Sequence, residues 1–187
     1  MAASEGEYGG FDRYCGEISV LYDALEHIKN NYSELTNRGK RDTIILRYAD
    51  ILDRSGRIDT GTFAMVKGRT ITLNHFMYDD TEYLKSEYEK LVSERFFTPG
   101  TDYRHVIDHE MGHVFAKHNR SAIARIQAVI DKLAENDHVS YEDYVLDNIS
   151  SYALRNNEII AEINAMRHGT SSELASRIWE EALENEI

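Results

Sequence analysis

The spacing of hydrophobic positions changes twice along the chain and predicts a short β-containing region between helical ones. Apolar residues recur at helical spacing over residues 17–35, which predicts a helix. A second apolar run over residues 44–52 follows an Asp-Thr capping pair and predicts another helix, with a strand as the alternative. Residues 62–66 and 69–74 flank a Lys-Gly pair, and the second segment alternates apolar residues with threonine. Together they predict a β-hairpin.

Beyond residue 80 the pattern is helical almost throughout. Helices are predicted over residues 82–95, 103–118, 121–135, 141–149, 157–167 and 171–184. We see no internal repeat or linker that would divide the chain. We therefore expect an α+β fold, in which a small N-terminal β-hairpin or sheet with helices precedes a mainly helical C-terminal part. Residues 1–10 are expected to form a flexible lead-in and residues 11–187 a single domain.

Charge and cysteine content argue against several classes of protein. The chain has 33 acidic and 21 basic residues, and its net charge of −12 argues against nucleic acid or an anionic membrane as a partner. Cys15 is the only cysteine, which excludes an internal disulfide and a cysteine zinc cage, and we expect a small buried side chain there. No apolar run approaches the ~18 residues of a membrane span, and the first residues do not resemble a signal peptide. A cytoplasmic or virion-associated protein is expected.

One segment carries a pattern typical of zinc enzymes. Residues 109–113 read His-Glu-Met-Gly-His, which is HExxH. On a helix, positions four apart differ by about 40°, so His109 and His113 can reach one metal ion, with Glu110 beside them. Apolar residues flank the motif, which indicates a packed helix, and Gly112 inside it indicates close approach of a neighbour. The alternative is an exposed amphipathic helix that carries two histidines by chance.

A catalytic zinc site needs a third protein ligand. The metzincin extension is absent, because Ala116 and Asn119 stand where it needs glycine and histidine. Glu158 and Glu162 lie four positions apart among apolar residues of the predicted helix 157–167. Two carboxylates on an apolar face are costly without a positive partner, and a zinc ion would supply one. We predict Glu158 as the ligand and Glu162 as the acceptor of a hydrogen bond from a ligand imidazole. The alternative is that both glutamates reach solvent.

The combination of these motifs resembles the gluzincin metallopeptidases. In that arrangement HExxH is followed some forty-five residues later by a helical Glu-x-x-Ala-Glu, as at residues 158–162 here. The details are similar to the anthrax lethal factor-like peptidases, and especially to the related metallopeptidase domains of phage minor head (head morphogenesis) proteins. The matching stretches fall within roughly residues 60–168: the strand 69–74, the loop 97–102, HEMGH, and the segments 151–153 and 157–162.

This resemblance implies a zincin-like fold and a zinc-dependent endopeptidase. Zn²⁺, held by His109, His113 and Glu158, would activate a water for attack on a peptide bond. Glu110 would be the general base. The resemblance also implies a tyrosine shortly before the ligand glutamate that donates to the oxyanion, and Tyr152 is the match.

The resemblance also bears on partners. A protein or peptide substrate would add as a strand to an edge of the hairpin, expected at the segment Arg69–Asn74. Tyr141 and Tyr144 are the alternatives to Tyr152 for the oxyanion. A rival interpretation is a non-catalytic or self-processing structural module of a larger phage or mobile-element assembly protein.

The remaining histidines are given structural interpretations. His105 lies one turn before the motif, where a capping or surface position is expected rather than a place at the rim of the site. No partner is predicted for the others singled out, which are His27, His75, His138 and His168.

Overall fold

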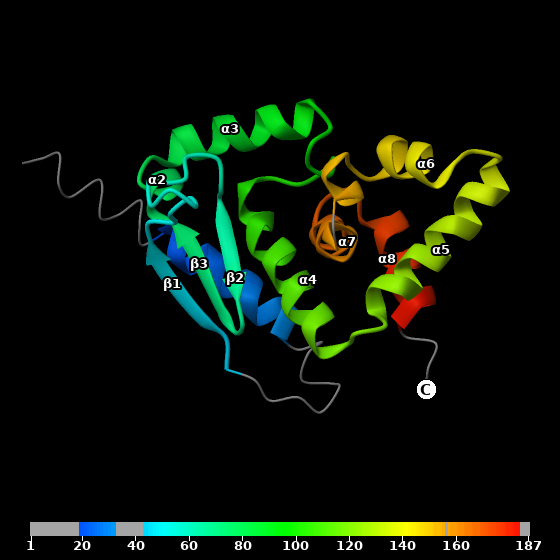
Figure 1. Cartoon of the computed structure of the whole chain (residues 1–187), viewed down its shortest axis with the longest axis horizontal. Helices are drawn as coiled ribbons and strands as arrows, with labels where there is room; N and C mark the ends of the chain where they lie inside the picture. The colour runs from blue at the N-terminus through cyan, green and yellow to red at the C-terminus, as the bar shows by residue number, and fades with distance from the viewer. Residues whose placement is uncertain (1–18, 33–42, 156, 184–187) are drawn as a thin grey trace, which may run out of the picture.

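The computed structural model describes residues 19–32, 43–155 and 157–183. The expected lead-in at residues 1–10 and the expectation for Cys15 lie outside this part of the chain. Within it, a three-stranded sheet is combined with helices, and the C-terminal part is mostly helical (Figure 1), which confirms the predicted α+β class. Among the described helices none is both long and apolar enough to span a bilayer.

The sheet consists of β1 (Ile45–Ala49), β2 (Ala64–Lys67) and β3 (Thr70–Asn74), in the order β1-β3-β2. β3 pairs in parallel with β1 and antiparallel with β2, so the predicted hairpin is present. Gly68 in its turn has a φ of +70°, a conformation that glycine adopts without steric penalty. Ile71 and Leu73 on the central strand are fully buried, so this face of the sheet forms part of the core.

The helices follow the predicted pattern closely after residue 80. The described residues 19–32 are helical, in agreement with the predicted N-terminal helix. The other elements are α2 (His75–Tyr78), α3 (Thr81–Ser93), η1 (Tyr103–His105), α4 (Val106–His118), α5 (Ala122–Asp137), α6 (Tyr141–Asn148), η2 (Tyr152–Leu154), α7 (Glu158–His168) and α8 (Ser172–Leu183). The short α2, which follows β3 directly, was not predicted. Asp102 and His105 form a capping box before α4, which confirms the capping role expected for His105.

Two predictions for the N-terminal part are wrong. Residues 45–49 form a strand, the stated alternative, rather than a helix. The reason is non-local: five residue pairs between β1 and β3 satisfy the main chain of β1, and this pairing leaves no mark in the local pattern. The second error concerns β3, which is the central strand. Its main chain is paired on both sides and offers no free edge for a substrate, so the edge strand of the hairpin is β2.

Helix α4 lies between the sheet and the C-terminal helices and packs closely against α7 (Figure 1). Gly112 occupies the contact. A Cβ built on Gly112 would lie 2.7 Å from Cα of Ala161 and 3.0 Å from the carbonyl oxygen of Ile160. This confirms the predicted close approach at Gly112. The short separation brings the first turn of α7 alongside the middle of α4, where the histidines of HExxH are found.

Candidate metal centre

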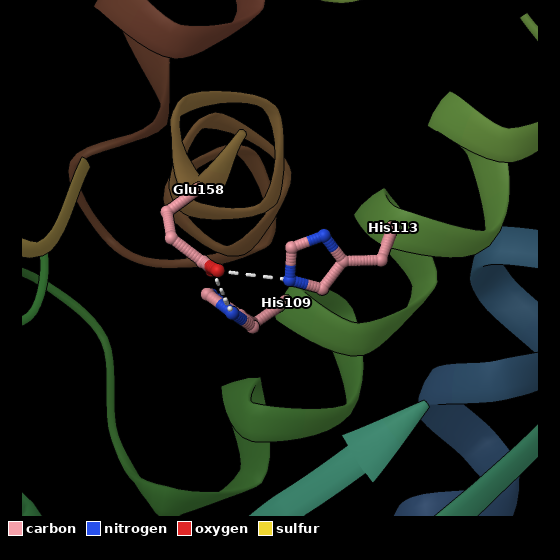
Figure 2. Close-up of side chains that lie close together, drawn as sticks. All are labelled: His109, His113 and Glu158. Carbon is pink, nitrogen blue, oxygen red and sulfur yellow. Dashed lines mark hydrogen bonds and ion pairs between the residues drawn. The ribbon is translucent and has the colours of Figure 1, made fainter. Parts of the chain in front are cut away.

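Two helices bring together the three residues predicted to bind metal. His109 and His113 lie one turn apart on α4, and Glu158 is the first residue of α7. Nε2 of His109 and Nε2 of His113 each lie 3.1 Å from the same oxygen, Oε2 of Glu158. Figure 2 shows the two imidazoles converging on this carboxylate from one side of α4. The three candidate ligand atoms all lie within 4.8 Å of one another.

This donor set fits a divalent transition metal. Two imidazole nitrogens and one carboxylate oxygen are the ligands of many catalytic zinc sites. Ligands about 2.1 Å from a tetrahedral ion are separated by about 3.4 Å, and the two nitrogen–oxygen distances of 3.1 Å come close to that value. A small movement of side chains would therefore admit one ion between His109, His113 and Glu158.

The charge of Glu158 is stabilised within the site. Burial alone would raise the pKa of its carboxyl group. Hydrogen bonds from His109 and His113 outweigh that effect and lower the pKa to about 2. The position of Glu158 in the first turn of α7 adds a favourable interaction between the carboxylate and the helix dipole. Glu158 is therefore ionised at neutral pH, as a metal ligand must be.

Glu162 lies one turn further along α7 and holds His109 from the other side of the ring. Its Oε1 accepts a hydrogen bond from Nδ1 of His109 at 2.9 Å. Its Oε2 accepts from the backbone N–H of Thr98 at 3.0 Å, from the Thr98 hydroxyl at 2.6 Å and from the Ser150 hydroxyl at 2.7 Å. With only 2% of its surface exposed, Glu162 is fixed by these donors, and it directs Nε2 of His109 towards Glu158.

Thr98 and Ser150 were not identified from the sequence. Thr98 lies in the loop after α3, and Ser150 lies between α6 and η2, far from the motif along the chain. The signal that could have found them is the buried carboxylate itself, because a buried carboxylate needs several donors. Which loops supply those donors depends on the tertiary structure.

The same carboxylates also act on His109. Burial alone would lower its pKa, but its hydrogen bonds to Glu158 and Glu162 outweigh that effect and raise the pKa to about 10.

Glu110 is buried beside the candidate ligands, with 6% of its surface exposed. Burial raises its pKa, and the nearby His109 and His113 oppose this increase. The backbone N–H of Val66 on β2 donates a hydrogen bond to its carboxylate. Glu110 therefore faces the space between α4 and the edge strand, and its raised pKa favours a role in proton transfer.

Tyr152 lies against the same site. Its ring centroid is 5.7 Å from that of His109, and its backbone N–H donates to the carbonyl of Phe96 at 3.1 Å. Burial, followed by the charges of Glu158 and Glu110, raises its pKa to about 12, so the hydroxyl keeps its proton and can donate a hydrogen bond. The alternatives Tyr141 and Tyr144 lie on α6, and neither lines the two described pockets next to His109.

Two adjoining pockets open onto these residues. The larger, of about 670 Å³, lies between the edge strand β2, the loop before it and α4. The smaller, of about 210 Å³, has five aromatic side chains in its lining, which are Phe63, Tyr88, Phe96, Phe97 and Tyr152. His109, Glu110 and Tyr152 line both pockets, so the candidate metal centre lies where the two meet.

A second buried polar cluster, missed by the sequence analysis, lies on the opposite side of α4. Asp108 has no exposed surface, and its carboxylate lies 2.6 Å from Nδ1 of His27 and accepts a hydrogen bond from the Asn31 amide at 2.5 Å. The amide of Asn164 on α7 donates to Asn31 and to the carbonyl oxygen of Asp108. The cluster joins the N-terminal helix, α4 and α7 behind the ligands. A charged residue directly before HExxH was the only local signal.

Comparison of the chain with known protein families, curated proteins and solved structures finds no match.

Proposed function

We propose that this protein is a zinc-dependent endopeptidase. One observation carries the proposal: a His109–His113–Glu158 cluster lies at the junction of two pockets, with Glu110 and Tyr152 beside it. These groups match the parts needed for peptide hydrolysis, namely a set of metal ligands, a base and a hydrogen-bond donor. An accidental pair of histidines would not account for the buried, fully bonded carboxylate behind His109.

The edge strand β2 supports binding of an extended peptide. The N–H of Asn74 donates to the carbonyl of Phe63 at 2.9 Å, and these residues stand opposite each other in the hairpin. Because hydrogen-bonded pairs alternate along antiparallel strands, Ala64 and Val66 direct their main-chain groups away from β3. The hydrogen bond from Val66 to Glu110 agrees with this alternation. A substrate strand would therefore pair with β2 at Ala64, beside the candidate metal centre.

The side chains then have distinct roles. His109, His113 and Glu158 would hold the zinc ion, which when bound supplies Lewis acidity to polarise the scissile carbonyl. Glu110 accepts the proton of the attacking water and passes it to the leaving amine, for which its raised pKa is suited. The hydroxyl of Tyr152 donates a hydrogen bond to the developing oxyanion. Glu162 acts through His109, whose ring it orients.

The test combines metal analysis with digestion of a peptide library. The protein, dialysed against zinc, is expected to hold close to one zinc ion per chain and to cleave library peptides, and a chelator is expected to abolish cleavage. Glu110→Gln retains the size of the side chain but cannot accept the proton, so we expect unchanged zinc content and a loss of activity of about 100-fold or more. Glu135→Gln, at an exposed position of α5, is the matched control and should leave both unchanged.

The alternatives give different results in the same assays. Absence of stoichiometric zinc would overturn the metal site. Zinc in both proteins without cleavage by either would reject the endopeptidase and support the structural-module interpretation. Loss of zinc in Glu110→Gln would show that Glu110 is itself a ligand.

A further inference from the structure

The smaller pocket has one arginine among its lining residues. Five aromatic side chains contribute to its wall, and Arg155 lines the same pocket as His109 and Glu110 of the candidate metal centre. Glu110 and Glu162 are the acidic residues that line this pocket, and His109 is the other basic one. In a chain with a net charge of −12, a guanidinium at this place is a specific local exception.

The guanidinium of Arg155 is held by rings rather than by a carboxylate. Its Cζ lies 4.8 Å from the ring centroid of Phe96 and 5.1 Å from that of Tyr152. Such stacking fixes the plane of the group and leaves its N–H donors directed outwards. No ion pair joins Arg155 to a carboxylate within the described residues. The side chain is exposed, so its donors are open to a ligand.

The backbone around Arg155 ties it to the catalytic groups. Its N–H donates to the carbonyl of Tyr152 at 3.0 Å, and its own carbonyl accepts from the N–H of Glu158 at 3.1 Å. These two hydrogen bonds therefore join Arg155 to the proposed oxyanion donor in η2 and to a proposed metal ligand at the start of α7. A substrate group bound by Arg155 would be positioned relative to the reacting bond.

We infer that Arg155 is a specificity-determining residue that binds a carboxylate of the substrate, next to an apolar side chain seated in the aromatic pocket. Guanidinium and carboxylate pair through two parallel hydrogen bonds, which a neutral amide cannot reproduce. The carboxylate can come from an acidic residue that follows the apolar one or from the C-terminus of the peptide. This inference rests on the proposed peptidase function, because it concerns the same site.

The test measures binding, so that it does not depend on cleavage. Zinc-loaded Glu110→Gln protein is titrated with fluorescein-labelled peptides, and anisotropy gives the dissociation constants. One pair of peptides has the sequence Ala-Ala-Phe-X-Ala-Ala-amide, with X as glutamate or glutamine. A second pair, Ala-Ala-Phe, ends in a free carboxylate or in an amide. We expect the carboxylate member of at least one pair to bind about tenfold more tightly than its amide partner, as for a hydrogen bond to a charged group. The pair that shows the difference identifies the source of the carboxylate.

Three substitutions in the same background separate recognition from structure. Arg155→Gln should bring the ratio within the discriminating pair to about one, and Arg155→Glu should invert it. Arg54→Gln removes an arginine that lines the larger pocket and should preserve the ratio. If Arg155→Gln weakens all four peptides equally, its role is to support the loop and the inference is wrong. The inference is also wrong if the Glu110→Gln protein that retains Arg155 binds both members of each pair equally, or binds none of the peptides.

The outcome is independent of the peptidase assay. Cleavage by the native protein with no preference for a carboxylate would retain the proposed function and reject the role of Arg155. A carboxylate preference that depends on Arg155, in a protein that cleaves no peptide, would retain the binding role and reject the peptidase.

Discussion

Substitution of Gly112 by alanine tests whether the contact between α4 and α7 sets the geometry of the candidate metal centre. The added Cβ would lie 2.7 Å from Cα of Ala161, 3.0 Å from the carbonyl oxygen of Ile160 and 3.2 Å from Cβ of Asn164. Ordinary contact between carbon atoms requires about 3.5–4.0 Å. The nearest two atoms belong to the backbone of α7, so no rotation of a side chain relieves the overlap. The helices must separate by about 1 Å.

The size of that movement determines the expected effect. Helix propensity alone favours alanine over glycine by about 1 kcal/mol, whereas overpacking costs about 1–3 kcal/mol. We expect the free energy of unfolding of Gly112→Ala to fall by up to about 2 kcal/mol. Zinc binding should suffer more, because His109 and His113 lie on α4, Glu158 lies on α7, and ligand distances tolerate only about 0.2 Å. A loss of affinity of about 10- to 100-fold is expected, similar to the effect of removing a residue that orients a ligand.

The measurements are chemical denaturation without metal and zinc affinity by competition with a chromogenic chelator. Ala116→Gly, one turn further along α4, is the control. It lowers helix propensity by about 1 kcal/mol without forcing the helices apart, so it should destabilise the protein while preserving zinc affinity once folded. If Gly112→Ala stabilises the protein and binds zinc as tightly as the native chain, the contact does not control the site and this reasoning fails.

Three further predictions concern the surroundings of the site. Glu158→Ala should abolish stoichiometric zinc binding, whereas Glu162→Ala should weaken it about 10- to 100-fold; the reverse order, measured by the same competition assay, would exchange their roles. His27→Ala removes the partner that lies 2.6 Å from the buried carboxyl group of Asp108, so denaturation should show a loss of about 1.5–3 kcal/mol, and a neutral result would contradict the pairing. Burial disfavours the charged form of His105, but the capping carboxylate outweighs this effect and raises its pKa above the usual 6.5. The contribution of this pair to the stability of the folded protein is thus complete below pH 6.5 and is lost as the pH rises through the raised pKa of His105. The melting temperatures of the native protein and His105→Asn should therefore differ more at pH 6 than at pH 9, and an equal difference would count against the pair.

Local pattern was sufficient for the helices after residue 80 and for the hairpin. Amphipathic spacing reports the burial of one helix face, and a Lys-Gly turn between alternating segments reports a hairpin, so both signals are present in short windows of sequence. The same reasoning failed for residues 45–49. Their strand exists because β3, more than 20 residues later in the chain, pairs with it. It also failed for the position of β3 within the sheet, because strand order is a property of the whole domain.

The candidate site divides in the same way. Helical periodicity alone was enough to group His109 with His113 and Glu158 with Glu162, because each pair lies four positions apart. The two pairs face each other because α4 and α7 approach closely at Gly112. The donors to Glu162 come from two separate loops. The position of the Arg155 guanidinium depends on its contacts with the rings of Phe96 and Tyr152, which belong to different segments of the chain. Spacing along a helix fixes which side chains share a face, but the partner of that face is chosen by packing between segments distant in sequence, and only the folded chain brings those segments together.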